Sequence, residues 1–123
     1  MRIIIIIFFG GGLGSLCRYL VSRWITGLAT AAFYGTFLVN ITGCFLIGFL
    51  VFYLGRFETS SLNWKLFLVT GFCGGYTTFS SFSLENVQLM NDHRLFTALL
   101  YTMGSVVLGF LATYAGIIVA RNI

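Results

Sequence analysis

Long apolar runs fill most of this chain, and short polar clusters separate them. The four runs lie near residues 3–25, 32–54, 64–90 and 95–120. Each is close to the roughly 20 residues that a helix needs to cross the hydrocarbon core of a bilayer. The turn and charged residues between them lie at 26–27, 55–61 and 91–94. The pattern predicts an all-α membrane protein with four transmembrane helices in a single domain, residues 1–123.

The composition supports a membrane protein and excludes an ordinary soluble domain. Hydrophobic residues make up 59% of the chain, charged residues make up 8%, proline is absent, and the mean hydropathy is +0.99. Met1-Arg2 followed by an apolar run also fits the start of a signal peptide. Residues 10–14 are glycine-rich and favour a retained helix instead, because small residues let another backbone come close.

Charge placement gives little preference for one orientation in the membrane. If four helices span the bilayer, both termini lie on one side, which holds Arg2, Arg56, Lys65 and Arg121. The opposite side holds Arg18, Arg23 and Arg94. Basic loops set the orientation of membrane proteins, and four against three is a bias of only one. We therefore expect insertion in both orientations and pairing with an inverted copy, with a fixed topology as the open alternative.

The third apolar run carries a predicted helix break within residues 74–78. Gly74-Gly75 stands near its middle, and Tyr76-Thr77-Thr78 follows with residues that suit a continuous helix poorly. Backbone freed from a helix at membrane depth must be buried in protein or line a cavity. Freed carbonyls suit a hard cation, and the amides that open the second half-helix suit an anion. A simple glycine kink is the alternative interpretation.

Several polar and aromatic residues near this break are candidate ion ligands. Phe79 and Phe82 share a helix face, and their ring edges carry positive potential. Asn40 has an amide that is expensive to leave unpaired in the second run, and an interhelical hydrogen bond is its other interpretation. In the fourth run, Tyr101, Ser105 and Thr113 form a discontinuous hydroxyl track or, alternatively, bonds between helices.

Two charges within or near the apolar runs also need an explanation, because intramembrane charge is a functional hypothesis by default. Arg18 either snorkels to the headgroups or forms an electropositive vestibule for anions. Glu85 would repel an anion unless it is paired, protonated or turned aside, so we interpret it as structural or as a cap of the vestibule. The three cysteines, Cys17, Cys44 and Cys73, show no Cys-x-x-Cys spacing and are interpreted as free thiols.

Three motifs together resemble the Fluc (CrcB) family of fluoride channels. They are GGLGSLCRY at residues 11–19, GTFLVN at 35–40 followed by Gly43, and GFCGGYTTFSSFSLE at 71–85. The resemblance covers all four apolar runs in their order. It implies a passive fluoride channel in the cell inner membrane, built as an antiparallel homodimer with two pores and a third helix broken at mid-membrane. It implies no nucleic-acid partner.

The resemblance also implies roles for individual residues. Asn40, Phe79 and Phe82 would line the fluoride path, and the carbonyls of Gly74 and Thr77 from each subunit would hold a structural Na⁺ at the dimer interface. The hydroxyls carried over are those of Ser80, Ser81, Tyr101, Ser105 and Thr113. Members of the family can have a serine one turn after the position of Ser105, where this chain has Gly109.

Two other functions fit parts of this sequence. Small multidrug transporters have four helices and similar length, but they use a carboxylate in the first helix, and residues 3–25 contain no acidic residue. A membrane subunit that only scaffolds other proteins is compatible with the composition. The single histidine, His93, is in a predicted loop, and no nucleophile with an adjacent base stands out, so we do not expect an enzyme.

Overall fold

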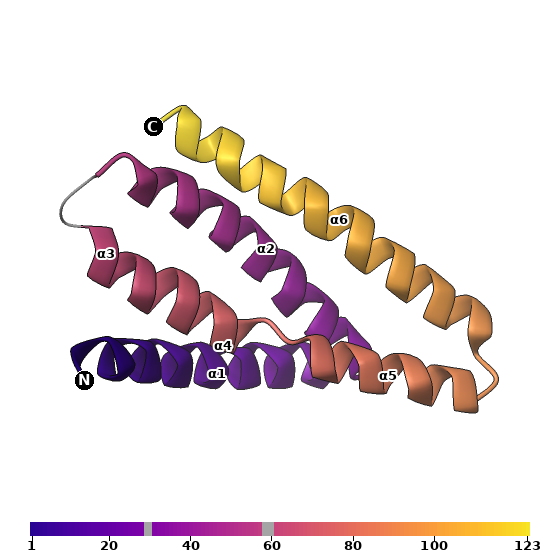
Figure 1. Ribbon diagram of the computed structural model, residues 1–123. Helices are drawn as coiled ribbons and strands as arrows, with labels where there is room; N and C mark the ends of the chain where they lie inside the picture. The colour runs from indigo at the N-terminus through magenta and orange to yellow at the C-terminus, as the bar shows by residue number, and fades with distance from the viewer. Residues whose placement is uncertain (29–30, 58–60) are drawn as a thin grey trace.

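The computed structural model describes residues 1–28, 31–57 and 61–123, so part of the second predicted loop, 58–60, lies outside the described residues. Every regular element within these ranges is helical (Figure 1). In chain order they are α1 (Arg2–Leu28), α2 (Phe33–Gly55), α3 (Ser61–Trp64), the π-helix η1 (Lys65–Cys73), α4 (Gly74–Tyr76), α5 (Phe79–Asn91) and α6 (Leu95–Arg121).

Three of these helices, α1, α2 and α6, are long and apolar enough to cross a membrane. Their bounds lie within a few residues of the predicted ones. The turn predicted at 26–27 is wrong, since α1 continues through both residues and the Thr26 hydroxyl donates to the Ser22 carbonyl at 2.7 Å. Threonine favours turns when its hydroxyl bonds the backbone in place of a helical bond, but here the hydroxyl bonds a carbonyl one turn back in the same helix, so the helix continues.

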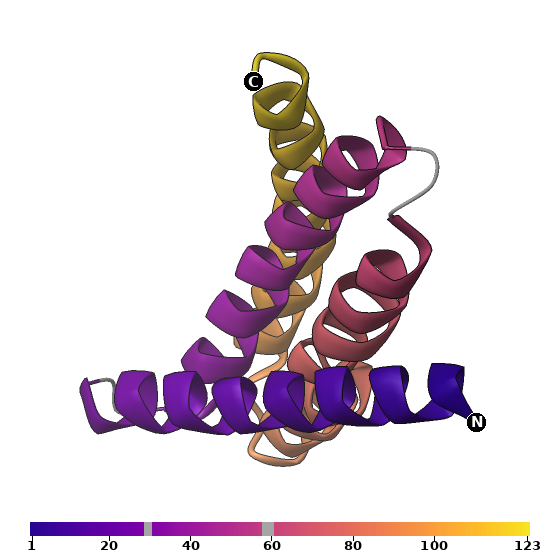
Figure 2. The same ribbon diagram turned by 90° about the vertical axis from the view of Figure 1, so that its left-hand side faces the viewer.

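Glycines set how closely the helices approach. α2 and α6 run in the same direction and form the most extensive helix pair, while α1 lies across η1 and α4 (Figures 1 and 2). A Cβ atom at Gly48 of α2 would overlap the Thr113 carbonyl of α6, and a Cβ at Gly116 would overlap a carbonyl of α2. Gly10 and Gly14 of α1 meet carbonyls of η1 in the same manner. The close backbone approach predicted for the glycine-rich residues 10–14 is confirmed at Gly10 and Gly14.

The third apolar run is interrupted, as predicted, and the structure narrows the interruption to two residues. Thr77 (φ −80°, ψ 156°) and Thr78 (φ −149°, ψ 120°) are extended, and α5 begins directly after them. Gly74 and Gly75 are helical themselves, because α4 includes both. Before the interruption, residues 65–73 form the wider π-helical turns, which the sequence did not predict.

A small core holds the second half of this segment against its neighbours. Leu89 of α5 packs with Ala98 and Tyr101 of α6, and the half-buried rings of Phe33, Phe37 and Phe82 surround them. His93 turns the chain between α5 and α6 with a positive φ of 57°. The extended pair at Thr77 and Thr78 is therefore held between two helical pieces that are each packed on other helices.

Candidate functional site

Asn40 of α2 bridges the interrupted backbone. Its side-chain N–H donates to the Thr78 carbonyl at 3.1 Å, and the Thr78 amide donates to its Oδ1 at 2.8 Å. The Asn40 side chain thus bonds both the backbone amide and the backbone carbonyl of Thr78, which is extended and lies outside the helices. The interhelical hydrogen bond that the sequence left open is formed. The amide group carries two N–H donors, and this bond uses one of them.

A cluster of hydroxyls covers the start of α5. Thr78 Oγ1 accepts from the Ser81 amide at 3.2 Å, which caps the helix. The same oxygen lies 3.1 Å from Ser80 Oγ and 3.2 Å from Ser81 Oγ. Ser80 is exposed and Ser81 is half-buried. The structure therefore brings both predicted serines to one threonine at the break.

The interruption also frees the two carbonyls expected to hold a cation. In a continuous helix the Gly74 carbonyl would accept from the Thr78 amide and the Thr77 carbonyl from the Ser81 amide. Those amides donate to Asn40 Oδ1 and Thr78 Oγ1 instead. Gly74 is exposed, and a Cβ atom built on it would meet nothing within 4 Å. Two oxygen ligands without their helical donors, beside open space, fit a hard cation such as Na⁺.

Phe79 and Phe82 lie together, as their spacing predicted. Their ring centroids are 5.7 Å apart, and Phe82 also meets Tyr101 edge to face at 5.0 Å. The two rings differ in exposure: Phe79 is 79% exposed, whereas Phe82 is partly buried in the core. One ring is thus fixed by the fold of this chain, and the other projects away from it.

Glu85 is paired, and the structure identifies both partners. The Thr36 hydroxyl donates to one carboxylate oxygen at 2.6 Å, and the Tyr101 hydroxyl donates to the other at 2.7 Å. Thr36 and Tyr101 are both buried. Hydroxyl donors stabilise a carboxylate that would otherwise be costly at this depth.

An open cavity of about 600 Å³, here called the inner cavity, adjoins the break. It is lined by six of the predicted ligand residues, namely Asn40, Gly74, Thr77, Phe79, Phe82 and Ser105. The hydroxyl of Ser105 is buried and has no hydrogen-bond partner within the described residues. A buried hydroxyl without a partner at a cavity wall is the group that a polar ligand would engage.

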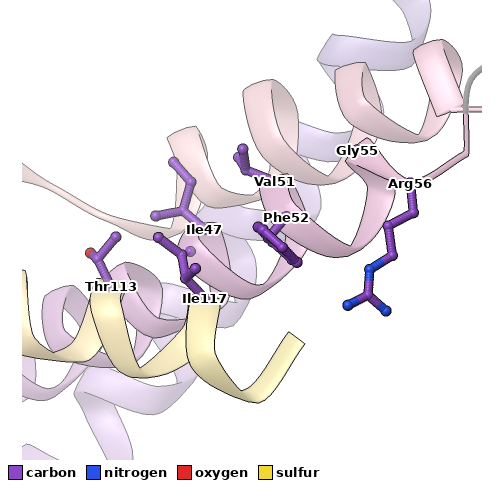
Figure 3. A pocket seen from close by; sticks show the side chains of 8 residues that line it. Ile47, Val51, Phe52, Gly55, Arg56, Thr113 and Ile117 are labelled. Atoms are coloured by element: carbon purple, nitrogen blue, oxygen red, sulfur yellow. The ribbon is translucent and has the colours of Figure 1, made fainter. Parts of the chain in front are cut away.

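Thr113 lies apart from the inner cavity. Its hydroxyl donates to the Gly109 carbonyl at 3.0 Å, and the residue lines a separate groove between α2 and α6 (Figure 3). Ile47 lines both spaces. The structure therefore brings Tyr101 and Ser105 near the phenylalanines of the same chain, but not Thr113.

A smaller and more polar space of about 320 Å³, here called the polar pocket, also adjoins the break. Arg18, Ser81 and Glu85 line it together with Thr36. Thr78 lines both the polar pocket and the inner cavity. Sequence reasoning did not assign Thr78 or Thr36 to the site. The sequence pattern that could have identified Thr36 is its position four residues before Asn40, which puts both side chains on one face of the helix.

Among the described residues, no three His, Cys, Asp or Glu side chains gather as a metal site. Cys17, Cys44 and Cys73 are free thiols, as predicted. The groups that this arrangement offers to a ligand are the hydrogen-bond donors of amides and hydroxyls, the edges of aromatic rings and backbone carbonyls.

Comparison with known proteins places the chain in a family. The model of the CrcB-like protein, Camphor Resistance (CrcB) family matches residues 5–117. The chain belongs to this family. A protein of Flavobacterium psychrophilum is 47% identical over the full length of both chains. A protein of Chlorobium chlorochromatii is 44% identical over 96% of this chain and 92% of its own. A protein of Rhizobium meliloti is 43% identical over 98% of each. All three are named fluoride-specific ion channel FluC.

Proposed function

We propose that this protein is a passive, fluoride-selective channel that exports fluoride across the cell inner membrane. The observation that carries the proposal is the inner cavity, where six of the residues predicted as ion ligands line one space beside a broken helix. Family membership and the names of relatives that are 43–47% identical support the same function. No acidic residue lies in α1, so no observation favours the multidrug transporter.

The channel is proposed to be an antiparallel homodimer with two pores. In each chain, α1, α2 and α6 cross the bilayer, and residues 61–91 form the fourth, interrupted span. The inner cavity is open on one side, where Phe79 and Gly74 are exposed. Polar backbone cannot face lipid, so a second copy is needed to close this side. The charge bias of only one residue permits the inverted orientation that such a dimer requires.

The proposed path runs along groups that each bind fluoride weakly. Arg18 brings a positive charge to the polar pocket that attracts an anion, and the Glu85 carboxylate in the same pocket accepts hydrogen bonds from Thr36 and Tyr101. Beyond the break, Asn40, Phe79 and Phe82 replace part of the anion's water, and the hydroxyls of Ser80, Ser81, Tyr101, Ser105 and Thr113 continue the path across the two subunits. Fluoride is small and strongly hydrated, so closely spaced donors suit it and exclude larger halides. Weak successive contacts permit throughput.

A structural Na⁺ is proposed at the dimer interface, held by the Gly74 and Thr77 carbonyls of both subunits. The loss of their helical donors supports this assignment. When bound, the ion supplies fixed positive charge at mid-membrane and neutralises the carbonyl dipoles of the break.

Reconstitution tests the proposal directly. Liposomes that contain the purified protein are loaded with potassium fluoride. When a potassium ionophore lets K⁺ leave with the anion, so that no opposing membrane potential builds up, a fluoride electrode should record fluoride release. Liposomes loaded with chloride are the selectivity control. Release of neither ion, or of both at equal rates, would refute a fluoride-selective channel.

A matched pair of variants then tests the site. Phe82→Ile removes a ring that lines the inner cavity, whereas Phe110→Ile makes the same change at a ring that is 75% exposed on α6. We expect Phe82→Ile to lower fluoride efflux and leave dimer assembly intact, and Phe110→Ile to change neither. Loss of assembly in Phe82→Ile would make this residue structural.

A further inference from the structure

Tyr76, the last helical residue before the break, is tied to α2 by a hydrogen bond. Its hydroxyl lies 3.0 Å from Thr42 Oγ1, and the residue is only 7% exposed. The one hydrogen of the Thr42 hydroxyl is directed to its own helix, where the Leu38 carbonyl lies at 2.8 Å and the Val39 carbonyl at 3.1 Å. Tyr76 is therefore the donor, and its side chain links the end of α4 to α2.

The neighbours of Tyr76 leave it little freedom to move. Its ring stacks on that of Phe72, with centroids 5.7 Å apart and planes 10° from parallel. A Cβ atom at Gly43 of α2 would lie 3.2 Å from Tyr76 Cδ1 and would overlap the methyl group of Thr77. A Cβ at Gly14 of α1 would lie 2.8 Å from the Tyr76 amide nitrogen. Both α1 and α2 therefore pack closely against this residue, and close packing resists its displacement.

Tyr76 also stands between the two residues proposed to hold Na⁺. The Thr77 amide and the Thr77 hydroxyl both donate to the Cys73 carbonyl at 3.0 Å, so the helical bonds continue up to this carbonyl. The carbonyls without helical donors begin with Gly74, because the Thr78 amide donates to a side chain instead. Tyr76 follows Gly74 by two residues and precedes Thr77 directly, so a shift of its backbone would move both proposed ligands.

We propose that the hydrogen bond from Tyr76 to Thr42 positions the Gly74 and Thr77 carbonyls for Na⁺, which makes Tyr76 a positioning residue of the proposed cation site. Ligands that are already held in place bind more tightly, because ordering mobile groups on binding costs free energy. Tyr76→Phe would keep the ring that stacks on Phe72 and lose only the bond to α2. This inference rests on the Na⁺ site of the proposed function, but it does not depend on which anion is conducted.

Thermal unfolding of the purified protein in detergent, measured over a series of NaCl concentrations, tests this inference. N-methylglucamine chloride keeps the ionic strength constant. An ion that binds only the folded state raises the unfolding temperature as its concentration passes its dissociation constant, so the Na⁺ concentration at half of the rise reports binding. We expect Tyr76→Phe to raise this concentration roughly fivefold, the factor that corresponds to one net hydrogen bond. If the variant instead loses the same number of degrees at every Na⁺ concentration, the bond is merely structural and the inference is overturned.

Variants of Thr42 test the bond from its other end and keep the test available if Tyr76→Phe does not fold. Thr42→Val removes the acceptor and should raise the Na⁺ concentration by the same factor, whereas Thr42→Ser keeps the acceptor oxygen and should bind Na⁺ like the wild type. Thr42→Val with Tyr76→Phe should have no further effect, because both changes delete one bond. Tyr53→Phe is the matched control, since it removes a tyrosine hydroxyl roughly 16 Å along α2 from Thr42. Additive shifts in the double variant, or an equal shift in the control, would overturn the inference.

Failure of this inference and failure of the proposed function give different results. Wild-type liposomes that release no fluoride refute the channel, but the Na⁺ dependence of unfolding does not require conduction. A wild type whose unfolding temperature does not respond to Na⁺ overturns this inference together with the proposed cation site, even if its fluoride efflux is normal.

Discussion

Replacing Asn40 by alanine tests the bridge that holds the broken helix. The change removes both hydrogen bonds to Thr78, of 2.8 and 3.1 Å, and leaves a buried amide and a buried carbonyl without partners. An unpaired buried polar group costs about 1–3 kcal/mol, which gives about 2–6 kcal/mol for the two. Hydrogen bonds between membrane helices average only about 0.6 kcal/mol, because the unfolded chain finds other partners. We therefore expect a loss of about 2–3 kcal/mol.

Two measurements check this expectation. The midpoint of thermal unfolding in detergent should fall by about 10 °C, given the usual shift of about 4 °C per kcal/mol for a domain of this size. Fluoride efflux from liposomes should fall roughly tenfold at equal amounts of folded protein, which corresponds to a rise of about 1.4 kcal/mol in the barrier to passage. The physical reason is that Thr78 and Phe79 lose their fixed position at the inner cavity.

Asn86→Ala provides the control. Asn86 is 6% exposed, its amide donates to the Phe82 carbonyl at 2.9 Å, and its Oδ1 accepts from Thr102 at 2.9 Å. The variant loses the same number of bonds but does not touch the break, so it should lose stability and keep most of its fluoride efflux. The reasoning is refuted if Asn40→Ala conducts like the wild type, or if both variants lose efflux equally.

Three further predictions concern the path and the packing. Ser105→Ala should lower fluoride efflux roughly tenfold without a change in thermal stability, because its buried hydroxyl has no partner in the described part of the chain and would bond only the anion. Gly14→Ala should lower the free energy of unfolding by about 1–3 kcal/mol in a denaturant titration, because its Cβ would overlap a carbonyl of η1. Gly12→Ala is the control and should leave the free energy of unfolding unchanged, because a Cβ there meets nothing within 4 Å. Gly109→Ser should be tolerated, with its Cβ 3.5 Å from Cys44 Sγ, and should raise efflux roughly threefold by adding one weak donor; an unchanged rate would count against a hydroxyl track.

The helices and the break could be predicted from the sequence because their signals are local. Apolar runs of helical length identify α1, α2 and α6, and the glycine and threonine cluster identifies the interruption. Local sequence did not determine that the extended residues are Thr77 and Thr78 rather than Gly74. Their position depends on Asn40, 38 residues away from Thr78, whose side chain pairs the extended backbone. A glycine pair tolerates a break, but the partner decides where the break occurs.

The role of Glu85 and the π-helical turns were not predictable for the same reason. Glu85 accepts hydrogen bonds from Thr36 and Tyr101, which lie on two other helices. The spacing of residues within one segment does not reveal a hydrogen-bond network that joins three helices. Residues 65–73 show no unusual composition, but they pack against the glycine face of α1, where a carbonyl meets Gly10. Tertiary contact, rather than propensity, accounts for both features.

The hydrogen bonds around the site explain why this arrangement suits passage rather than storage of an anion. Most of the proposed donor groups already bond within the protein: Tyr101 donates to Glu85, Thr113 donates to the Gly109 carbonyl, and Asn40 uses one of its two N–H donors on the Thr78 carbonyl. A passing anion must compete with these bonds, so each contact contributes less than a free donor would. Only the Ser105 hydroxyl is buried and unpaired within the described residues, which makes it the strongest single contact. A path of weak, replaceable contacts with one stronger point lets an ion both enter and leave.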